Sequence, residues 1–519
     1  MVEQYNCLME RKQKTTLWIL IVIGVIWFAA MIPANLTGAE TPEMLEVFEV
    51  DEYAQYLHVI RMITPGETLY GTFRNFLIYL HYYYGYPFYF WSALSILPFK
   101  TAATRVIVCV LRQMISVLPM ILSAGLLTWV GTKFRKILPS VLLFLFLLTM
   151  PAVLINNFWW HPDSLSLFFI SLTFFFLDRD ERHCGKNFLF AAAACGAATG
   201  TKYLGLYFCL AIPVYLLCCG LSVKEFFRKA GLFLLVMAAA ILISDPLLLL
   251  PQERAEIIRT MKTQMELSGV GIVLKYENPF WENGGLPSYI TDNYASGLCL
   301  ALGLIALFYG ILRGNRTNSL IILAYLVPAF LINTNAAARR LHDFLPILLP
   351  FFAMLPNLWN RKALTIASCL LIALQTGRNL HTDCSLYREQ LAREENSASI
   401  ALYKETVEKV LPETDVPAER MTRVWRDWKM YYPEQEGFVI FTDWEMATAE
   451  KIAEANPDLI LLERANIKAY GSEESLQNAV DSNEYQPIHE FYAAAGNDAI
   501  KGYHRVLENS AGSVFMREQ

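Results

Sequence analysis

Long apolar segments separated by short polar ones make up most of the chain as far as residue 377. A run of roughly 17–25 apolar residues can cross a bilayer as a helix, because its length matches the thickness of the hydrocarbon core. The pattern predicts about eleven transmembrane helices by this criterion. They lie at 17–34, 107–130, 138–157, 164–178, 187–200, 203–220, 230–250, 295–312, 319–334, 343–358 and 363–377. We therefore expect an all-α polytopic membrane protein over this part of the chain.

Basic residues between these segments predict which loops face the cytoplasm, where Lys and Arg accumulate. All six basic clusters fall on one side only if the apolar segment 85–98 does not cross the membrane and a break near Gly200 divides 187–220 into two helices. We expect 85–98 to lie on or dip into the membrane within a long first external loop, and the N-terminus to be cytoplasmic. The six clusters are Arg11/Lys12/Lys14, Lys133/Arg135/Lys136, Arg179/Arg182/Lys186, Lys224/Arg228/Lys229, Arg313/Arg316 and Arg361/Lys362.

The pattern changes after residue 377. Residues 385–410 are typical of an amphipathic helix, GFVIFTD (437–443) and PDLILLER (457–464) of strands, and 444–455 of a helix between them. This order predicts a small soluble α/β domain over 378–519, outside the cytoplasm, after a transmembrane domain over 1–377. A lid or a docking module is the simplest role for such a domain.

Composition supports a membrane protein and excludes some classes of function. The chain is 55% hydrophobic and 18% charged, whereas soluble globular proteins carry about 25% charged residues. Its formal net charge of -5 shows no basic bias, so we exclude nucleic acid as a partner. The cysteines form no CxxC pair and no Cys/His ligand spacing, so neither a zinc site nor a disulfide framework is indicated.

An acidic pair, Asp51–Glu52, lies in the first external loop within FEVDEYAQYLHVIRMI. Apolar residues of this segment form a stripe, which predicts an amphipathic helix on the membrane surface. One interpretation is that the pair caps the helix and interacts with its dipole. The other is a general base at the boundary between lipid and water, where a hydroxyl acceptor could meet a lipid-linked donor.

A second acidic motif, WWHPDSLSLFF (159–169), falls in a tight external turn between two predicted helices. Asp163 could cap the second helix. Ionisable groups at the edge of a span also tend to face cavities or partners, because lipid disfavours them. We therefore consider His161 and Asp163 as candidate site residues.

Cations on the same side are candidates for binding phosphate. Lys202 interrupts a long apolar stretch, and it either extends to the interface or faces an anion. Arg339 and Arg340 lie in an external loop, against the usual bias for basic residues inside. The planar guanidinium suits phosphate oxygens, so this pair is either a phosphate clamp or a partner for lipid headgroups.

Taken in order, these motifs resemble the GT-C glycosyltransferases. The similar segments are FEVDEYAQY (48–56), WHPDSLSLFF (160–169), GAATGTKYLGLY (196–207) and ARRLHDFLPILLP (338–350). The resemblance covers roughly residues 15–376 and is greatest to the branch of protein O-mannosyltransferases and the bacterial lipid A aminoarabinose transferase. The chain lacks a WWDYG-type motif, which argues against transfer of a preassembled glycan. HPD stands here in the second external turn, whereas the lumenal dolichol-pathway mannosyltransferases carry a similar HPDE in the first loop. This difference leaves the sugar and the subfamily open.

The resemblance implies a role for each matched residue. Asp51 would deprotonate the acceptor in an inverting transfer, Glu52 would support it, and Asp163 would orient acceptor or donor. Beside Asp163, we place His161 among the substrate-binding residues. Lys202 would contact the phosphate of a polyprenyl-phosphate sugar. Arg339 and Arg340 would contact that phosphate too.

We therefore expect transfer of a single sugar from a polyprenyl-phosphate donor to a lipid, glycan or protein acceptor outside the cytoplasm. The alternative is a transporter or flippase of lipid-linked sugars. Such transporters often show repeated halves and broken helices at mid-membrane, whereas the polar residues here gather on one face. The scheme requires no metal, because only the charge of one phosphate must be stabilised, and it is compatible with a divalent cation near Asp51 and Asp163. We expect a bacterial plasma membrane.

Overall fold

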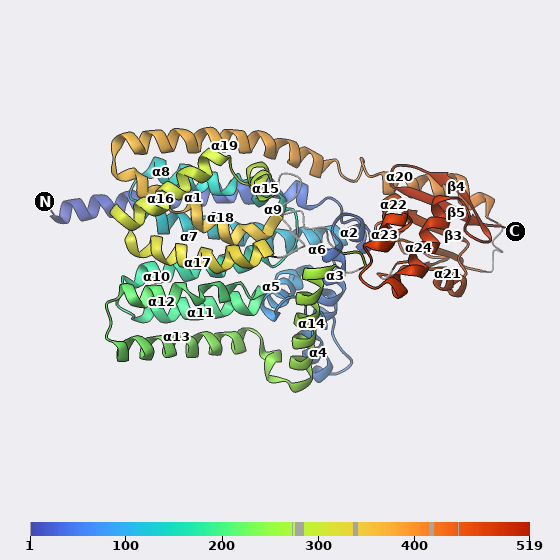
Figure 1. The fold of residues 1–519 in the computed structure, drawn as a ribbon, viewed down its shortest axis with the longest axis horizontal. Coiled ribbons are helices and arrows are strands. Elements are labelled where there is room, and N and C mark those ends of the chain that lie inside the picture. The colour runs from blue at the N-terminus through green and yellow to red at the C-terminus, as the bar shows by residue number, and fades with distance from the viewer. Residues whose placement is uncertain are drawn as a thin grey trace.

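The computed structural model describes residues 2–271, 273–275, 285–335, 341–414, 420–444 and 446–518. An elongated bundle of helices carries a small mixed sheet beyond one of its ends, and the N-terminus lies at the other end (Figure 1). Helices of the loops collect at the end next to the sheet, which we call the loop end. They are α2 (Pro42–Phe48), α3 (Val50–Ile63), α4 (Leu69–Leu77), α5 (Tyr86–Ile96) and α14 (Pro251–Val270).

Every predicted span contains helix, which confirms the all-α prediction for this part of the chain. The helices are α1 (Val2–Asn35), α6 (Thr104–Leu111) with α7 (Leu118–Thr132), α8 (Ile137–Leu148) with α9 (Pro151–Asn157), α10 (Asp163–Asp180), α11 (Lys186–Lys202), α12 (Ala211–Cys218), α13 (Val223–Ser244), α16 (Gly297–Arg313), α17 (Arg316–Asn335), α18 (Leu345–Phe352) and α19 (Lys362–Leu391). The chain is an integral membrane protein.

The number of crossings stays a prediction. Among the described residues, five helices are long and apolar enough to cross a membrane, and up to seven if each bent pair is one span. The axes of α8 and α9 meet at 62°. Pro151, the first residue of α9, lacks an N–H to continue the hydrogen bonds of α8, so the helix bends there.

The basic clusters meet at the end of the bundle opposite the loop end. Side chains in or beside each cluster bond to residues in or beside another cluster. All six clusters therefore lie on one surface of the bundle, as predicted. The bonds run from Gln13 to the Lys133 carbonyl at 2.9 Å, from Lys133 to Asp178, from Asn318 to Asp178 at 2.7 Å, from Lys229 to the Cys184 carbonyl at 2.8 Å and from Lys136 to the Trp359 carbonyl at 3.1 Å.

That residues 85–98 do not cross the membrane stays a prediction, which the length of their helix supports. They form α5, whose 11 residues would extend about 16 Å at the helical rise, against about 30 Å for a hydrocarbon core. Phe88 and Tyr89 are fully buried against the bundle, whereas Trp91 and Leu94 are exposed. Apolar side chains thus lie on both the buried and the exposed face of α5, as suits the predicted position on or dipping into the membrane.

The C-terminal region contains a five-stranded sheet in the order β2-β1-β3-β5-β4. Strand β1 is parallel to β2 and β3, and β5 is antiparallel to β3 and β4. The bounds are β1 (Thr422–Arg426), β2 (Phe438–Phe441), β3 (Leu459–Glu463), β4 (Tyr503–Glu508) and β5 (Gly512–Arg517), with α21 (Ala449–Ala455) between β2 and β3 and α24 (Ser482–Gly496) before β4. The predicted strand–helix–strand order is confirmed.

The single helix predicted over 385–410 is wrong. Helix α19 runs to Leu391, and a new helix, α20 (Ala398–Glu405), begins after a turn. Ser397 ends the turn, because its hydroxyl accepts the N–H of Ile400 at 3.3 Å as an N-cap. The division into domains at residue 377 stays a prediction, since α19 continues across that position.

Candidate functional site

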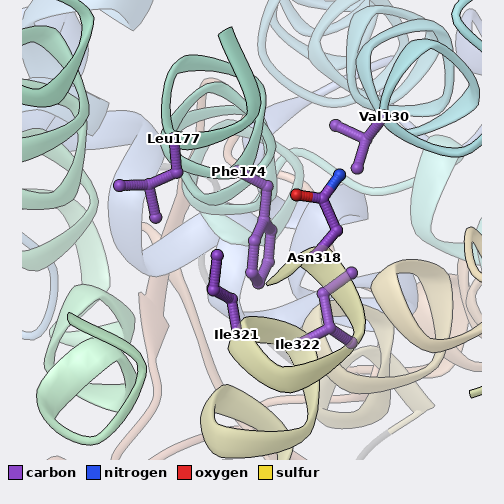
Figure 2. A pocket seen from close by; sticks show the side chains of 6 residues that line it. All are labelled: Val130, Phe174, Leu177, Asn318, Ile321 and Ile322. Atoms are coloured by element: carbon purple, nitrogen blue, oxygen red, sulfur yellow. The ribbon is translucent and has the colours of Figure 1, made fainter. Parts of the chain in front are cut away.

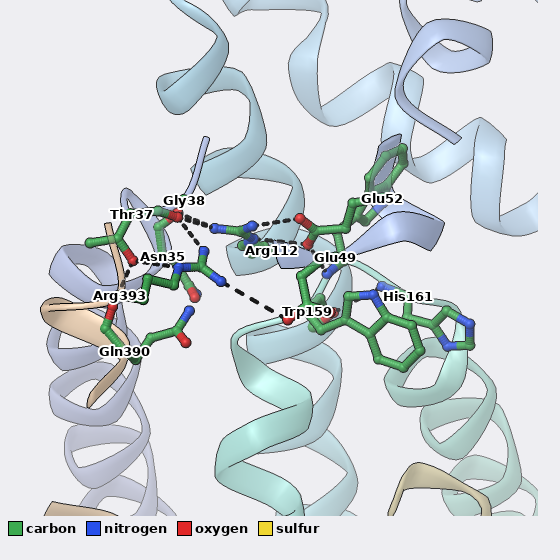
Figure 3. Close-up of polar contacts among 12 residues, drawn as sticks. Asn35, Thr37, Gly38, Glu49, Glu52, Arg112, Trp159, His161, Gln390 and Arg393 are labelled. Atoms are coloured by element: carbon green, nitrogen blue, oxygen red, sulfur yellow. Dashed lines mark hydrogen bonds and ion pairs between the residues drawn. The ribbon is translucent and has the colours of Figure 1, made fainter. Parts of the chain in front are cut away.

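Glu52 forms a buried ion pair with Arg112 at the loop end (Figure 3). Both side chains are fully buried. Arg112 donates from Nε to Oε1 at 2.8 Å and from Nη2 to Oε2 at 2.5 Å, which is the bidentate geometry that an arginine favours with a carboxylate. The backbone N–H of Trp160 donates to the same Oε1 at 2.6 Å. Glu52 therefore holds α3 against the turn before α10.

Arg112 also fixes the end of α1. Its Nη1 donates to the backbone carbonyls of Asn35 at 3.0 Å and Thr37 at 2.8 Å. The chain forms a π-helical turn over Arg112–Val117, between α6 and α7, and such turns are frequent at functional sites. These contacts use both oxygens of Glu52 and most donors of Arg112, as a structural role for Glu52 requires.

Asp163 is a second buried carboxylate at the loop end. It is the first residue of α10, and its side chain is 2% exposed. Lys202 Nζ lies 2.5 Å from Oδ1, and His161 Nδ1 contacts Oδ2. His161 Nε2 in turn lies 2.6 Å from the hydroxyl of Tyr84. Lys202 and His161 therefore hold the Asp163 side chain, and its role as a site residue stays a prediction.

Local backbone geometry places Lys202 next to Asp163. Lys202 is the last residue of α11, because Tyr203 adopts a left-handed conformation with φ of 57° that ends the helix. Residues other than glycine rarely adopt this conformation. The Lys202 side chain is 21% exposed, and an ammonium has three donors, so the pair with Asp163 leaves donors for an anion.

Asp51 lies half-buried in the first turn of α3, beside Glu52. Its negative charge acts on His81 and Tyr89. Burial lowers the pKa of His81 to about 4, with His58 adding to this shift and Asp51 opposing it, so the imidazole is neutral at pH 7. The Tyr89 hydroxyl lies 2.5 Å from His81 Nδ1.

Two tyrosines connect the acidic motifs. The pKa of Tyr89 is raised well above its usual range, first by burial and then by Tyr84 and Asp51. Tyr84 bonds to His161, and His161 also stacks on Trp159 with 3.9 Å between ring centroids (Figure 3). Asp51 and Asp163 therefore lie at the same end of the bundle, near a shared set of polar and aromatic side chains.

The structure groups five of the seven candidate residues at the loop end. These are Asp51, Glu52, His161, Asp163 and Lys202. Arg339 and Arg340 lie outside the described residues. Among the described residues, no group of three or more His, Cys, Asp or Glu side chains could hold a metal ion, and the absence of a metal requirement stays a prediction.

Sequence reasoning missed Arg112 and Tyr84. Arg112 interrupts the apolar span 107–130, which is the same signal that singled out Lys202. Tyr84 stands in a run rich in aromatic residues, where nothing in the sequence distinguishes it from its neighbours. Only its contact with His161 identifies it.

A small gap between side chains lies between α7, α10 and α17, away from these residues (Figure 2). Its lining is mostly apolar and includes Phe174 and Asn318. Phe174 is eleven residues beyond Asp163 along α10, about 16 Å at the helical rise. The space leaves no room for a water molecule, so it is a packing feature of the bundle.

Comparison with known proteins identifies the fold. No protein-family model and no curated protein sequence matches the chain. The structure of ArnT from Cupriavidus metallidurans bound to undecaprenyl phosphate is similar over 96% of this chain and 97% of that chain, with a TM-score of 0.56 and 11% identity. The apo structure of the same protein gives 0.51 and 10% over the same shares. The chain therefore has the GT-C fold that the sequence motifs predicted.

Proposed function

We propose that this protein is a membrane glycosyltransferase that moves a single sugar from a polyprenyl-phosphate donor to an acceptor, with inversion at the anomeric carbon. The supporting observation is that a carboxylate at the start of α3 and a carboxylate–lysine pair, Asp163 with Lys202, lie at the loop end of a fold shared with ArnT. ArnT has been crystallised bound to undecaprenyl phosphate, a ligand of the same class as the proposed leaving group.

Asp51 acts as the general base in this proposal. The acceptor hydroxyl oxygen attacks the anomeric carbon, and its proton passes to Asp51. The bond from that carbon to the phosphate oxygen breaks, and its electron pair leaves with the polyprenyl phosphate. A half-buried carboxylate at the start of α3 suits this role, because a general base must lie within hydrogen-bond reach of the acceptor hydroxyl.

Lys202 stabilises the charge that develops on the departing phosphate. A preorganised cation lowers the barrier most where charge grows in the transition state. Asp163 and His161 hold Lys202 and Tyr84 in place. Arg339 and Arg340 are proposed as further phosphate ligands, and no metal is needed for a leaving group with one phosphate.

The orientation of the protein follows from its charges. The basic clusters lie at the end opposite the site, and short basic loops face the cytoplasm. We therefore place the loop end and the C-terminal sheet outside the cytoplasm, in a bacterial plasma membrane. The acceptor is a lipid, glycan or protein on that side.

Proteoliposomes loaded with undecaprenyl-phosphate pentose or hexose test the function. We expect release of undecaprenyl phosphate and a covalent sugar product when membrane extract supplies acceptors. Movement of an intact fluorescent donor across the bilayer without release would instead show the transporter alternative and overturn the proposal.

Lys202→Met is expected to lower kcat/KM about 10²–10³-fold, the cost typical of removing one group that stabilises developing charge. Lys202→Arg should retain part of the activity, because it keeps a cation near the phosphate. Lys100→Met is the matched control, since Lys100 is an exposed lysine at the same end of the molecule. Equal rates for Lys202→Met and the control would remove Lys202 from the mechanism.

A further inference from the structure

Helix α2 lies between the bundle and the C-terminal sheet (Figure 1). Glu46 of α2 forms an ion pair with Arg426, the last residue of β1, at 2.5 Å. The two side chains are 0% and 2% exposed. Arg426 also donates to the carbonyls of Trp428 and Met430 at 3.1 and 3.2 Å. The pair is therefore a buried, oriented contact between the first loop and the sheet.

The position of Arg426 within the sheet is informative. In α/β sheets, ligands bind at the carboxyl ends of parallel strands. Arg426 stands at the carboxyl end of β1, which is parallel to both of its neighbours. The group bound there is a carboxylate of the chain's own first loop, Glu46. The sheet thus contacts α2 at the carboxyl edge of its parallel strands.

An apolar contact lies beside this ion pair. Met44 of α2 is buried against Ile400 and Tyr431, with Val47 and Phe48 packed beside them. This seat fixes one side of α2 against the C-terminal region.

Arg393, just after the end of α19, contacts the first loop on its other side. Arg393 donates from Nε to the Thr37 hydroxyl at 3.1 Å and lies 4.0 Å from Glu49 (Figure 3). Its guanidinium stacks over Phe48 at 4.9 Å from the ring centroid. The chain is therefore clamped at Glu46 and Glu49, immediately before α3 begins at Val50.

These clamps reach the proposed base through a very short path. Asp51 is five residues beyond Glu46, and the backbone N–H of Glu52 donates to the carbonyl of Glu49 at 2.9 Å. Helices α2 and α3 pack against each other. A shift of Glu46 therefore moves the first turn of α3.

Stability alone does not explain the ion pair. Glu46 Oε1 and Arg426 Nε are buried without a hydrogen-bond partner in the described structure, which costs free energy. Replacing a buried ion pair by apolar side chains is often neutral or stabilising, so retaining such a pair fits a role in specifying geometry.

We infer that the C-terminal domain is part of the catalytic apparatus: Arg426 and Glu46 are positioning residues that orient α2 and, through it, set Asp51 against the acceptor. The inference rests on the proposed function. In this inference the sheet holds the general base in position. The C-terminal domain therefore affects kcat without contacting the substrate.

Arg426→Met tests the inference in the full-length protein, with Arg464→Met as the control. Arg464 pairs with Glu508 within the C-terminal domain, and its side chain is 55% exposed. We expect Arg426→Met to lower kcat about 100-fold, the effect that a misplacement of about 1 Å can have, with donor KM unchanged. Amide hydrogen exchange should rise over residues 42–57 and stay unchanged in β3. Glu46→Gln, a milder change, should shift both readouts in the same direction.

The double variant Glu46→Met/Arg426→Met separates positioning from stability. We expect it to recover the wild-type melting temperature while kcat stays low, because two apolar side chains do not fix the orientation of α2. Recovery of kcat together with stability, or exchange that changes only within 422–434, would overturn the inference. A wild-type protein without turnover would refute the proposed function instead. Amide hydrogen exchange over residues 42–57 would then still show whether Arg426 affects the start of α3.

Discussion

Asp51→Asn is expected to reduce sugar transfer about 10²–10⁴-fold, the contribution typical of a general base. An amide keeps the size of the side chain but accepts no proton at neutral pH. Asp51 is half-buried at the start of α3, and its neighbour Glu52 makes the structural contacts. The variant should therefore insert into membranes and melt like the wild type. The measurement is the initial rate of undecaprenyl phosphate release, alongside thermal unfolding in detergent.

Glu67→Gln is the control for this prediction. Glu67 is an exposed carboxylate of the same loop, so its neutralisation removes the same charge at a distance from the site. A normal rate for Asp51→Asn, or a matching loss in Glu67→Gln, would show that charge in the loop, and not a base at position 51, supports transfer.

Hydrophobic runs sufficed to predict the helices of the bundle, because lipid demands long apolar segments whatever the tertiary contacts. Loop charges predict that 85–98 stays on one side of the membrane, and the 11 residues of α5 are too few to span the hydrocarbon core. Strands β1, β4 and β5 escaped prediction. β1, with the sequence TRVWR, ends in an arginine whose burial depends on Glu46 from the first loop, a partner that no local pattern reveals.

The candidate site was predicted as a set of residues but not as a set of contacts. Asp163, His161 and Lys202 were recognised because charged groups are rare at the edges of apolar spans. Their pairing depends on how α10, α11 and the loop before α5 meet in space. Arg112 shows the same limit, since its partner Glu52 is 60 residues away.

Separate roles for Asp51 and Glu52 lead to the second prediction with a large effect. Arg112→Met should lower the free energy of unfolding by about 3–5 kcal/mol, the usual cost of leaving one member of a buried ion pair without its partner. The uncompensated Glu52 carboxylate would lie fully buried, and the end of α1 would lose two hydrogen bonds. Denaturant titration in mixed micelles measures this loss, and transfer should fall in parallel with the folded fraction.

Arg228→Met provides the matched comparison, because Arg228 pairs with Glu225 at an exposed position on α13, where such pairs contribute about 0–1 kcal/mol. Glu52→Gln should lie between the two, since an amide still accepts from Arg112 and from the Trp160 N–H. Stability then distinguishes the two members of the acidic pair. We expect Asp51→Asn to be inactive although it is stable. We expect Glu52→Gln and Arg112→Met to lose activity because they are unstable. A Glu52→Gln protein that is fully stable yet inactive would instead assign proton transfer to Glu52, and the role proposed for Asp51 would be wrong.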